Sequence, residues 1–140
     1  MRFALFLLAY CVCLLNDDLQ SQTKGKAPSF ESIQKDISRG RQYVLVLLKR
    51  GPKSAKIDST ALEVSQRDHL VHLFKMKSQG VLPLFGPVTE DVDLRGICIF
   101  NLEDKDKVKA MLDDDAHIQS GRLVYELYSW FGLPGDKLPK

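Results

Sequence analysis

The residues of this chain best suited to chemistry lie in one helix–turn–strand segment. His69 falls at the edge of the apolar face of a helical repeat, where an imidazole can pass a proton to or from a bound ligand. Gly80 ends the repeat, and the following strand closes with Phe85-Gly86-Pro87. We predict a pocket between helix and strand, in which Phe85, Gly86 and Pro87 contact a ligand beside His69. The alternative is a core-edge histidine satisfied by a backbone carbonyl.

The other histidines and the cysteine suggest structural roles. His72 lies one helical turn after Asp68, so we expect a solvated side chain paired with that carboxylate. His117, in a polar stretch close to Asp115, is expected on the surface, and the alternative is that it lines the same pocket as His69. Cys98 stands between two isoleucines and is interpreted as a small buried apolar residue. His69, His117 and Asp115 could supply three metal ligands, but no regular ligand spacing supports a metal site, and we predict neither metal nor cofactor.

Charge and motifs exclude several classes of function. The formal net charge is +2 at pH 7, and no run of lysines and arginines interleaved with aromatics marks a nucleic-acid surface. The chain has no nucleophile elbow, no phosphate-binding glycine loop and no CxxC pair. The remaining candidates are a small-molecule enzyme, a ligand-binding protein and a structural module.

The first residues are typical of a secretory leader. Ala4 to Leu15 is almost wholly apolar, about a dozen residues, which suits a signal peptide and is too short for a membrane span. We predict a signal peptide over 1–21 and hence a secreted or periplasmic protein. The alternatives are an N-terminal apolar helix that belongs to the fold and acylation at Cys11 or Cys13, which would anchor the protein to lipid.

After the leader, the pattern predicts one domain with a short preceding helix. Residues 22–41 are assigned to a linker and a short helix, which Ser29 can cap, and 132–140 to a C-terminal tail. Between them, apolar runs of strand character alternate with two helical repeats at 43–48, 58–79, 81–85, 96–102, 103–112 and 122–130. The order is β-α-β-β-α-β, an α+β ferredoxin-like fold with a four-stranded antiparallel sheet and both helices on one face.

This architecture leaves one sheet face without a cover. The runs 43–48 and 96–102 are apolar on both sides of the strand, so the face away from the helices must also be shielded from water. A second copy packing sheet against sheet would cover it. We therefore expect a homodimer.

The elements and their residues together resemble the YciI-like, or YCII-related, family of dimeric α+β-barrel proteins. The matching features are Tyr43-Val44-Leu45 in the first strand, His69-Leu70-x-x-Leu73 in the helix, Gly80, Gly86-Pro87 after the second strand, Asp115 with Gly121 before the last strand, and Trp130. The resemblance covers residues 42–131.

The resemblance implies a dimeric α+β barrel with a small-ligand pocket that holds a His–Asp pair for acid–base chemistry. By position His69 matches the family histidine and Asp115 the aspartate, although the assignment could slip to Asp113 or Asp114. One relative eliminates chloride from a chlorinated aromatic compound. The chain departs from the family pattern at Gln66, where relatives carry an arginine, and this weakens the case for an anionic substrate.

The sequence thus predicts a cofactor-independent lyase or isomerase that acts on a small cyclic substrate, with His69 as base or acid and Asp115 as its orienting group. A dimeric protein that binds a small ligand without turning it over, or that is purely structural, is the alternative.

Overall fold

The structure is a computed structural model that describes residues 27–55 and 58–139. By its internal contacts the chain divides into two units, Met1–Lys35 and Asp36–Lys140. The predicted signal peptide, 1–21, lies outside the described residues. Among the helices that are described, none is both long enough and apolar enough to cross a membrane.

The short N-terminal helix expected after Ser29 is present as α1, Phe30–Ile37. Ser29 caps it: its Oγ accepts from the backbone N–H of Ser32 over 3.2 Å, and its carbonyl accepts from the N–H of Ile33 over 3.0 Å. None of the residues in α1 is buried.

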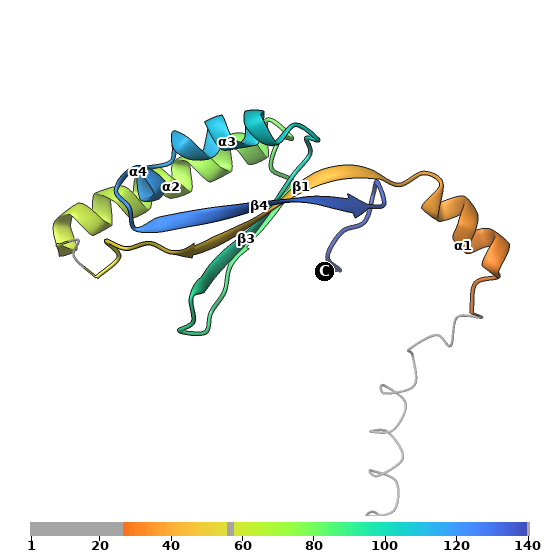
Figure 1. Cartoon of the computed structure of the whole chain (residues 1–140), viewed down its shortest axis with the longest axis horizontal. Coiled ribbons are helices and arrows are strands. Elements are labelled where there is room, and N and C mark those ends of the chain that lie inside the picture. The colour runs from red at the N-terminus through yellow and green to blue at the C-terminus, as the bar shows by residue number, and fades with distance from the viewer. Residues whose placement is uncertain (1–26, 56–57, 140) are drawn as a thin grey trace, which may run out of the picture. The chain divides into compact units, whose positions relative to one another are not determined.

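The second unit is a four-stranded antiparallel sheet with helices covering one face (Figure 1). Its elements are β1 (Arg41–Arg50), α2 (Ser59–Ser78), β2 (Leu84–Pro87), β3 (Leu94–Phe100), α3 (Lys105–Asp113), α4 (Ala116–Gln119) and β4 (Leu123–Gly132). The strands lie in the order β2-β3-β1-β4, and each neighbouring pair is antiparallel. This confirms the predicted α+β, ferredoxin-like fold.

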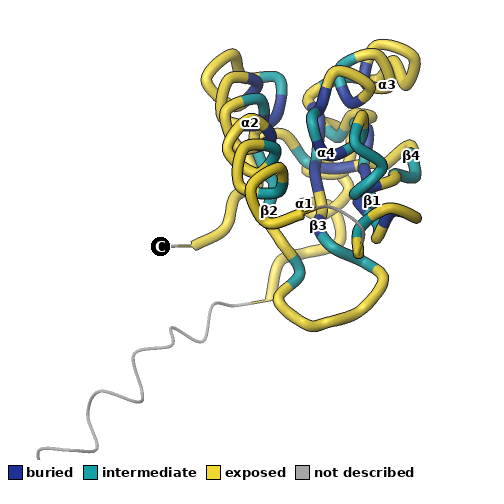
Figure 2. Tube along the Cα trace, turned by 90° about the vertical axis from the view of Figure 1, so that its left-hand side faces the viewer, coloured by how far each residue is buried: buried dark blue, intermediate teal, exposed yellow. Residues whose placement is uncertain are grey.

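The core lies between the sheet and the helices (Figure 2). Alternate residues of β1, Val44, Val46 and Leu48, are buried, because side chains on a strand point to opposite faces in turn. The same face of β3 contributes Cys98 and Phe100. The helices close the core with residues at three- and four-residue spacing, Leu73, Met76, Val108 and Leu112.

The link from α2 to β2 differs from the prediction. Gly80 has φ +71°, a left-handed conformation that ends the helix, and the backbone N–H groups of Val81 and Leu82 both donate to the Met76 carbonyl. These two residues therefore belong to the helix terminus, and Leu82 is buried in the core. As a result β2 begins at Leu84, three residues later than expected.

A further helix, α4, stands where the sequence predicted only a polar stretch. Asp104 caps α3 by accepting from the backbone N–H groups of Asp106 and Lys107. Asp115 caps α4 in the same way, with its side chain accepting from the N–H of His117. The single turn of α4 fixes the position of Asp115 relative to α2.

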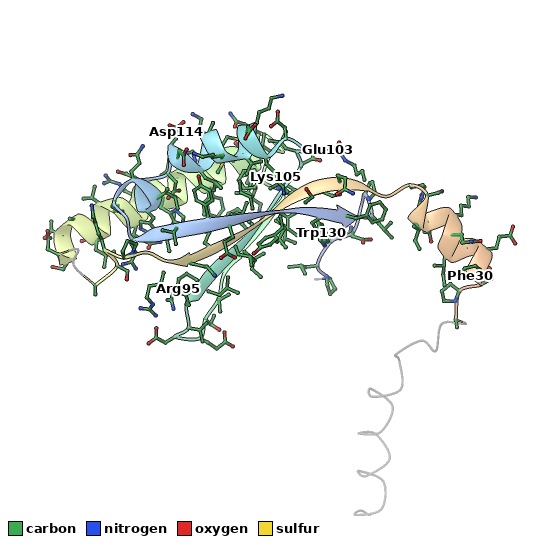
Figure 3. The ribbon with its side chains drawn as sticks, viewed as in Figure 1. Phe30, Arg95, Glu103, Lys105, Asp114 and Trp130 are labelled. Carbon is green, nitrogen blue, oxygen red and sulfur yellow. The ribbon has the colours of Figure 1, made fainter. Side chains whose placement is uncertain are left out.

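The sheet face away from the helices is apolar. Cross-strand pairs Leu45–Ile99, Leu47–Ile97 and Tyr43–Trp130 lie on it, together with Val124 and Tyr128. Ile97, Val124, Tyr128 and Trp130 are each more than a third exposed. Figure 3 shows that Trp130 lies toward one end of the sheet and Arg95 toward the other. We call this surface the open face.

Candidate functional site

His69 and Asp115 are in contact between α2 and the start of α4. The Nδ1 atom of His69 lies 2.7 Å from Oδ2 and 2.9 Å from Oδ1 of Asp115. Both side chains are removed from water, with 8% of His69 and 1% of Asp115 exposed. A buried carboxylate needs hydrogen-bond partners, and the ring of His69 is one of those that Asp115 has.

The helix cap explains why Asp115, and not a neighbour, meets the histidine. Its Oδ1 accepts the backbone N–H of His117 over 2.9 Å, which holds the carboxylate toward α2. Asp113 is instead tied to Lys109 and to the hydroxyl of Tyr125, and Asp114 is exposed. The structure therefore settles which of the three consecutive aspartates lies beside His69.

Asp115 is held in its ionised form. Burial alone would raise the pKa of this carboxyl, but the hydrogen bond and charge of His69 and the N–H of His117 outweigh burial and lower the pKa below its usual value. An ionised carboxylate only accepts hydrogen bonds, so His69 donates through Nδ1–H. In the neutral ring, Nε2 then carries a lone pair and no proton. Among the described residues, none is hydrogen-bonded to that Nε2.

His117 corrects the prediction of a surface side chain. It is 3% exposed, and its ring stacks on that of His69 with centroids 4.3 Å apart and an angle of 14° between the planes. Burial, followed by the nearby His69 and Arg122, lowers the pKa of His117 to about 4, so the ring is neutral at pH 7. Its Nε2 is buried and has no hydrogen-bond partner among the described residues.

His72 is also placed differently from the expectation of a solvated residue paired with Asp68. Its Nε2 lies 2.8 Å from the backbone carbonyl of Met111, so the side chain joins α2 to α3. Asp68 pairs with Arg67 instead. Of the two histidines one turn apart on α2, His72 links helices and His69 faces the cavity.

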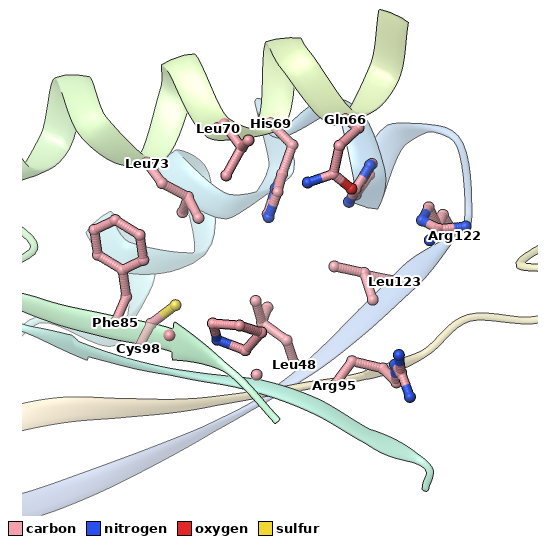
Figure 4. Close-up of a pocket in the computed structure, with 14 residues that line it drawn as sticks. Leu48, Gln66, His69, Leu70, Leu73, Phe85, Arg95, Cys98, Arg122 and Leu123 are labelled. Atoms are coloured by element: carbon pink, nitrogen blue, oxygen red, sulfur yellow. The ribbon is translucent and has the colours of Figure 1, made fainter. Parts of the chain in front are cut away.

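A cavity of about 220 Å³ opens beside His69, between α2 and the sheet (Figure 4). The predicted ligand-contacting residues Phe85, Gly86 and Pro87 all line it. Most of the remaining wall is apolar, and the polar contributions come from Gln66, His69, Arg95, His117 and Arg122. In Figure 4 the ring of His69 points from α2 into this space.

Cys98 forms part of the cavity floor but is not suited to act as a nucleophile. It is buried, and desolvation, with a smaller contribution from the charge of Asp115, raises the pKa of its thiol to about 12. The thiol therefore stays protonated near neutral pH. This agrees with its interpretation as a small apolar residue.

Sequence reasoning missed two residues of the cavity wall, Arg95 and Arg122. Arg122 immediately precedes β4, and Arg95 lies where the pairing of β1 with β3 shifts its register. A basic residue directly after Gly121 at a strand start was the available signal. Gln66, at the position where the resembled family carries an arginine, also lines the cavity.

Within the described ranges, no group of three or more histidine, cysteine, aspartate or glutamate side chains is arranged to hold a metal ion. The site therefore consists of an imidazole–carboxylate pair, a second buried imidazole and two arginines around a small cavity. Groups of these kinds are able to transfer a proton and to contact an anion.

The fold has a counterpart among solved structures. No protein-family model matches the chain. No curated protein matches it either. The chain is similar to the solved structure of 5-chloro-2-hydroxyhydroquinone dehydrochlorinase (TftG) from Burkholderia phenoliruptrix AC1100 in complex with 2,5-dihydroxybenzoquinone. The identity is 17%, the TM-score 0.41, and the match covers 62% of this chain and 92% of that one. At this level of similarity, function has to be argued from the chain's own residues.

Proposed function

We propose that this protein is a YciI-like, cofactor-independent lyase or isomerase that moves a proton within a small cyclic substrate. One observation carries the proposal: His69 donates Nδ1–H to the buried carboxylate of Asp115, at 2.7 Å from Oδ2, on the wall of a cavity of about 220 Å³. A base, its orienting group and space for a substrate are thus found together.

Asp115 gives His69 two properties that a general base needs. It keeps the proton on Nδ1, so that Nε2 is the basic atom, and its negative charge stabilises the imidazolium that forms when Nε2 accepts a proton. The carboxylate is itself fixed by the N–H of His117, so the pair is oriented before substrate arrives. Preorganisation of this kind lowers the barrier without a cofactor.

The proton that His69 is suited to remove is one on a carbon next to a carbonyl group. The C–H bond breaks, its proton goes to Nε2, and its electron pair forms an enolate with the charge on the carbonyl oxygen. Return of the proton to another carbon isomerises the substrate. Departure of an anionic group from the next carbon, with a new C=C bond, completes an elimination, and His69 then releases its proton to water.

The cavity limits the substrate to about one ring. An engineered apolar cavity of about 150 Å³ holds benzene. The larger volume here admits a six-membered ring with one or two substituents. Phe85, Leu73 and Leu123 supply apolar wall for such a ring.

The proposal is tested by exchange of substrate hydrogen for solvent deuterium. With 3-oxocyclohexanecarboxylate as the probe in D₂O, we expect the protein to speed deuterium uptake next to the ketone, followed by mass spectrometry. His69→Gln should reduce this rate by about 10²–10⁴-fold, the usual contribution of a general base. His72→Gln, on the same helix and off the cavity wall, is the matched control and should retain the rate.

The competing function is binding of a small ligand without turnover. It is favoured by the polar residues of the wall that play no part in proton transfer, Arg95, Arg122 and His117. A probe that binds in the cavity while its hydrogens exchange no faster than in buffer would support this alternative. If the probe neither binds nor exchanges its hydrogens faster than in buffer, the result would support a purely structural module.

We propose in addition that two copies pack through their open faces and form the dimeric α+β barrel. The exposed apolar strand residues of this face, among them Ile97, Val124 and Trp130, would be shielded by a second sheet. Sedimentation of the domain at micromolar concentration should then give twice the protomer mass.

The secretory leader also remains a proposal. Residues 1–21 fit a signal peptide, and the mature protein would then begin near Gln22. N-terminal sequencing of protein from the medium or periplasm tests this, and an acylated N-terminal cysteine would support the lipid-anchored alternative.

A further inference from the structure

Arg95 and Arg122 lie at one end of the cavity, away from Phe85 (Figure 4). Arg122 directly precedes Leu123, the first residue of β4. Arg95 is the extra residue at an irregularity of β3, where Leu48 pairs with Gly96 but Lys49 pairs with Leu94. Such bulges re-aim a side chain that regular alternation would send to the other face, and they recur beside active sites.

Both arginines also line a second, smaller hollow of about 80 Å³, together with Arg50 and Ser54. Three arginines therefore line the second hollow, and two of them, Arg95 and Arg122, line both. The carboxylate of Asp91 contacts Arg50 and lies 3.5 Å from Nη1 of Arg95. Asp91 is thus an exposed carboxylate shared by Arg50 and Arg95, and the three arginines together carry more positive charge than it neutralises.

Arg122 is the cation without compensation. Within 27–55 and 58–139 its side chain has no hydrogen bond or ion pair, whereas Nη1 of Arg95 also reaches the carbonyls of Glu90 and Val92, at 3.2 and 3.3 Å. A guanidinium presents donors in a planar fork that matches the two oxygens of a carboxylate. On a half-buried arginine, those donors are available to a ligand.

A second observation is independent of the arginines. The ring of His117 lines the cavity, and its Nε2 is buried without a partner among the described residues. A buried polar atom without a hydrogen bond costs free energy, so His117 marks this end of the cavity as one where a polar partner is missing. The positive charge of Arg122 is one of the causes that lower the pKa of His117, so the two side chains lie near each other at this end of the site.

We propose that this end of the cavity binds the carboxylate of a small monocyclic acid, held between Arg122 and Arg95, with its ring against the apolar wall below His69. This deepens the proposed function by naming its substrate class as ring compounds that carry a carboxylate. It also reverses the expectation drawn from Gln66: positive charge comes from the sheet, not from α2.

The test is binding of benzoate, compared with its neutral isostere benzamide and with inorganic phosphate, an anion without a ring. Chemical shifts and calorimetry on the full domain give the dissociation constants. We expect benzoate to bind at least about tenfold more tightly than benzamide, as for one charge-assisted hydrogen bond. Equal affinity for benzoate and benzamide, or for benzoate and phosphate, would overturn the proposal.

Variants locate the carboxylate. Arg122→Gln should weaken benzoate by about tenfold or more and leave benzamide unchanged, and Arg95→Gln should act in the same direction. Arg67→Gln is the matched control, since Arg67 is an exposed arginine paired with Asp68 and lies off the cavity wall. Each variant's amide spectrum verifies its fold. Benzoate affinity that survives both cavity substitutions would contradict the proposal.

Benzoate has no hydrogen next to a ketone, so its binding does not depend on proton transfer. Arginine-dependent benzoate binding without any deuterium exchange would support the acid site and refute the enzyme. Deuterium exchange at equal rates in 3-oxocyclohexanecarboxylate and its methyl ester would support the enzyme and refute the acid site.

Discussion

The two faces of the sheet carry opposite kinds of side chain. The face under the helices holds a buried imidazole–carboxylate pair, a second buried imidazole and a small cavity. The open face is apolar and part-exposed, and Lys49 and Glu126 are its ion pair. Polar groups are buried where capped helices supply hydrogen bonds, and apolar groups are exposed where no helix lies. The first face is suited to chemistry and the second to association.

The largest expected effect follows from placing a charge on the open face. In Val124→Arg, an arginine would stand directly opposite Lys49 on β1 and bring a second cation into the sheet-to-sheet interface, at a cost of several kcal/mol in association free energy. We expect a monomer by sedimentation. Val64→Arg is the matched control, since Val64 on α2 is 46% exposed and Val124 42%. A dimer that persists in Val124→Arg would place the interface elsewhere.

Removing Asp115 should destabilise the fold more than any other single aspartate of its run. Asp115→Ala leaves Nδ1 of His69 and the N–H of His117 without their acceptor and uncaps α4, for which we expect a loss of about 2–4 kcal/mol in the free energy of unfolding. Urea denaturation measures it. Asp114→Ala, at the adjacent exposed position, should cost less than about 0.5 kcal/mol. An equal loss of stability in the two variants would show that Asp115 does not cap α4 or hold His69.

Acid should weaken the helix-covered face through His117. Its folded pKa of about 4 lies below the unfolded value of 6.5, so the unfolded chain binds more protons between these values and stability falls as pH drops through them. Between pH 7 and 5 this amounts to about 2 kcal/mol. Asp115, whose pKa is lowered, adds its own loss only below about pH 4.

The measurement is urea denaturation at both pH values, for the wild type and for His117→Phe, which keeps the stacked ring but cannot titrate. The variant should lose about 2 kcal/mol less on acidification. An identical pH dependence in the two proteins would show that His117 titrates normally.

The smallest effect belongs to the ion pair on the open face. Lys49 Nζ lies 2.7 Å from Glu126 Oε1, with side chains 33% and 41% exposed, and exposed pairs of this kind contribute little to stability. Glu126→Gln should lower the free energy of unfolding slightly at low salt and leave it unchanged at 1 M salt. A loss that persists at 1 M salt would show that Glu126 stabilises the open face by something other than its charge.

The fold could be predicted because its signals are local. Alternation along β1, apolar spacing in α2 and the caps at Ser29 and Asp58 each specify one element without reference to the others. The predicted elements were wrong at two places, where hydrogen bonds of backbone N–H groups determine the local structure. The N–H groups of Val81 and Leu82 return to Met76 and delay β2, and the cap at Asp115 creates α4.

The site was predictable only in part, because its contacts join distant segments. His69 stood out by its helix face, and Asp115 by the family resemblance. The burial of His117 depends on α4 packing against α2, and that of His72 on the carbonyl of Met111, neither of which is encoded in local spacing. Arg95 reaches the cavity through an irregular strand pairing, which periodicity cannot reveal.

The central claim is that Asp115 holds the proton of His69 on Nδ1 and leaves Nε2 free toward the cavity. The most direct measurement is the ¹⁵N spectrum of the histidine rings at pH 9, with and without benzoate. The account predicts a protonated Nδ1 and an unprotonated Nε2 in His69, with benzoate shifting the signals of His69 and His117 but not of His72. A proton on Nε2 of His69, or signals indifferent to benzoate, would contradict it.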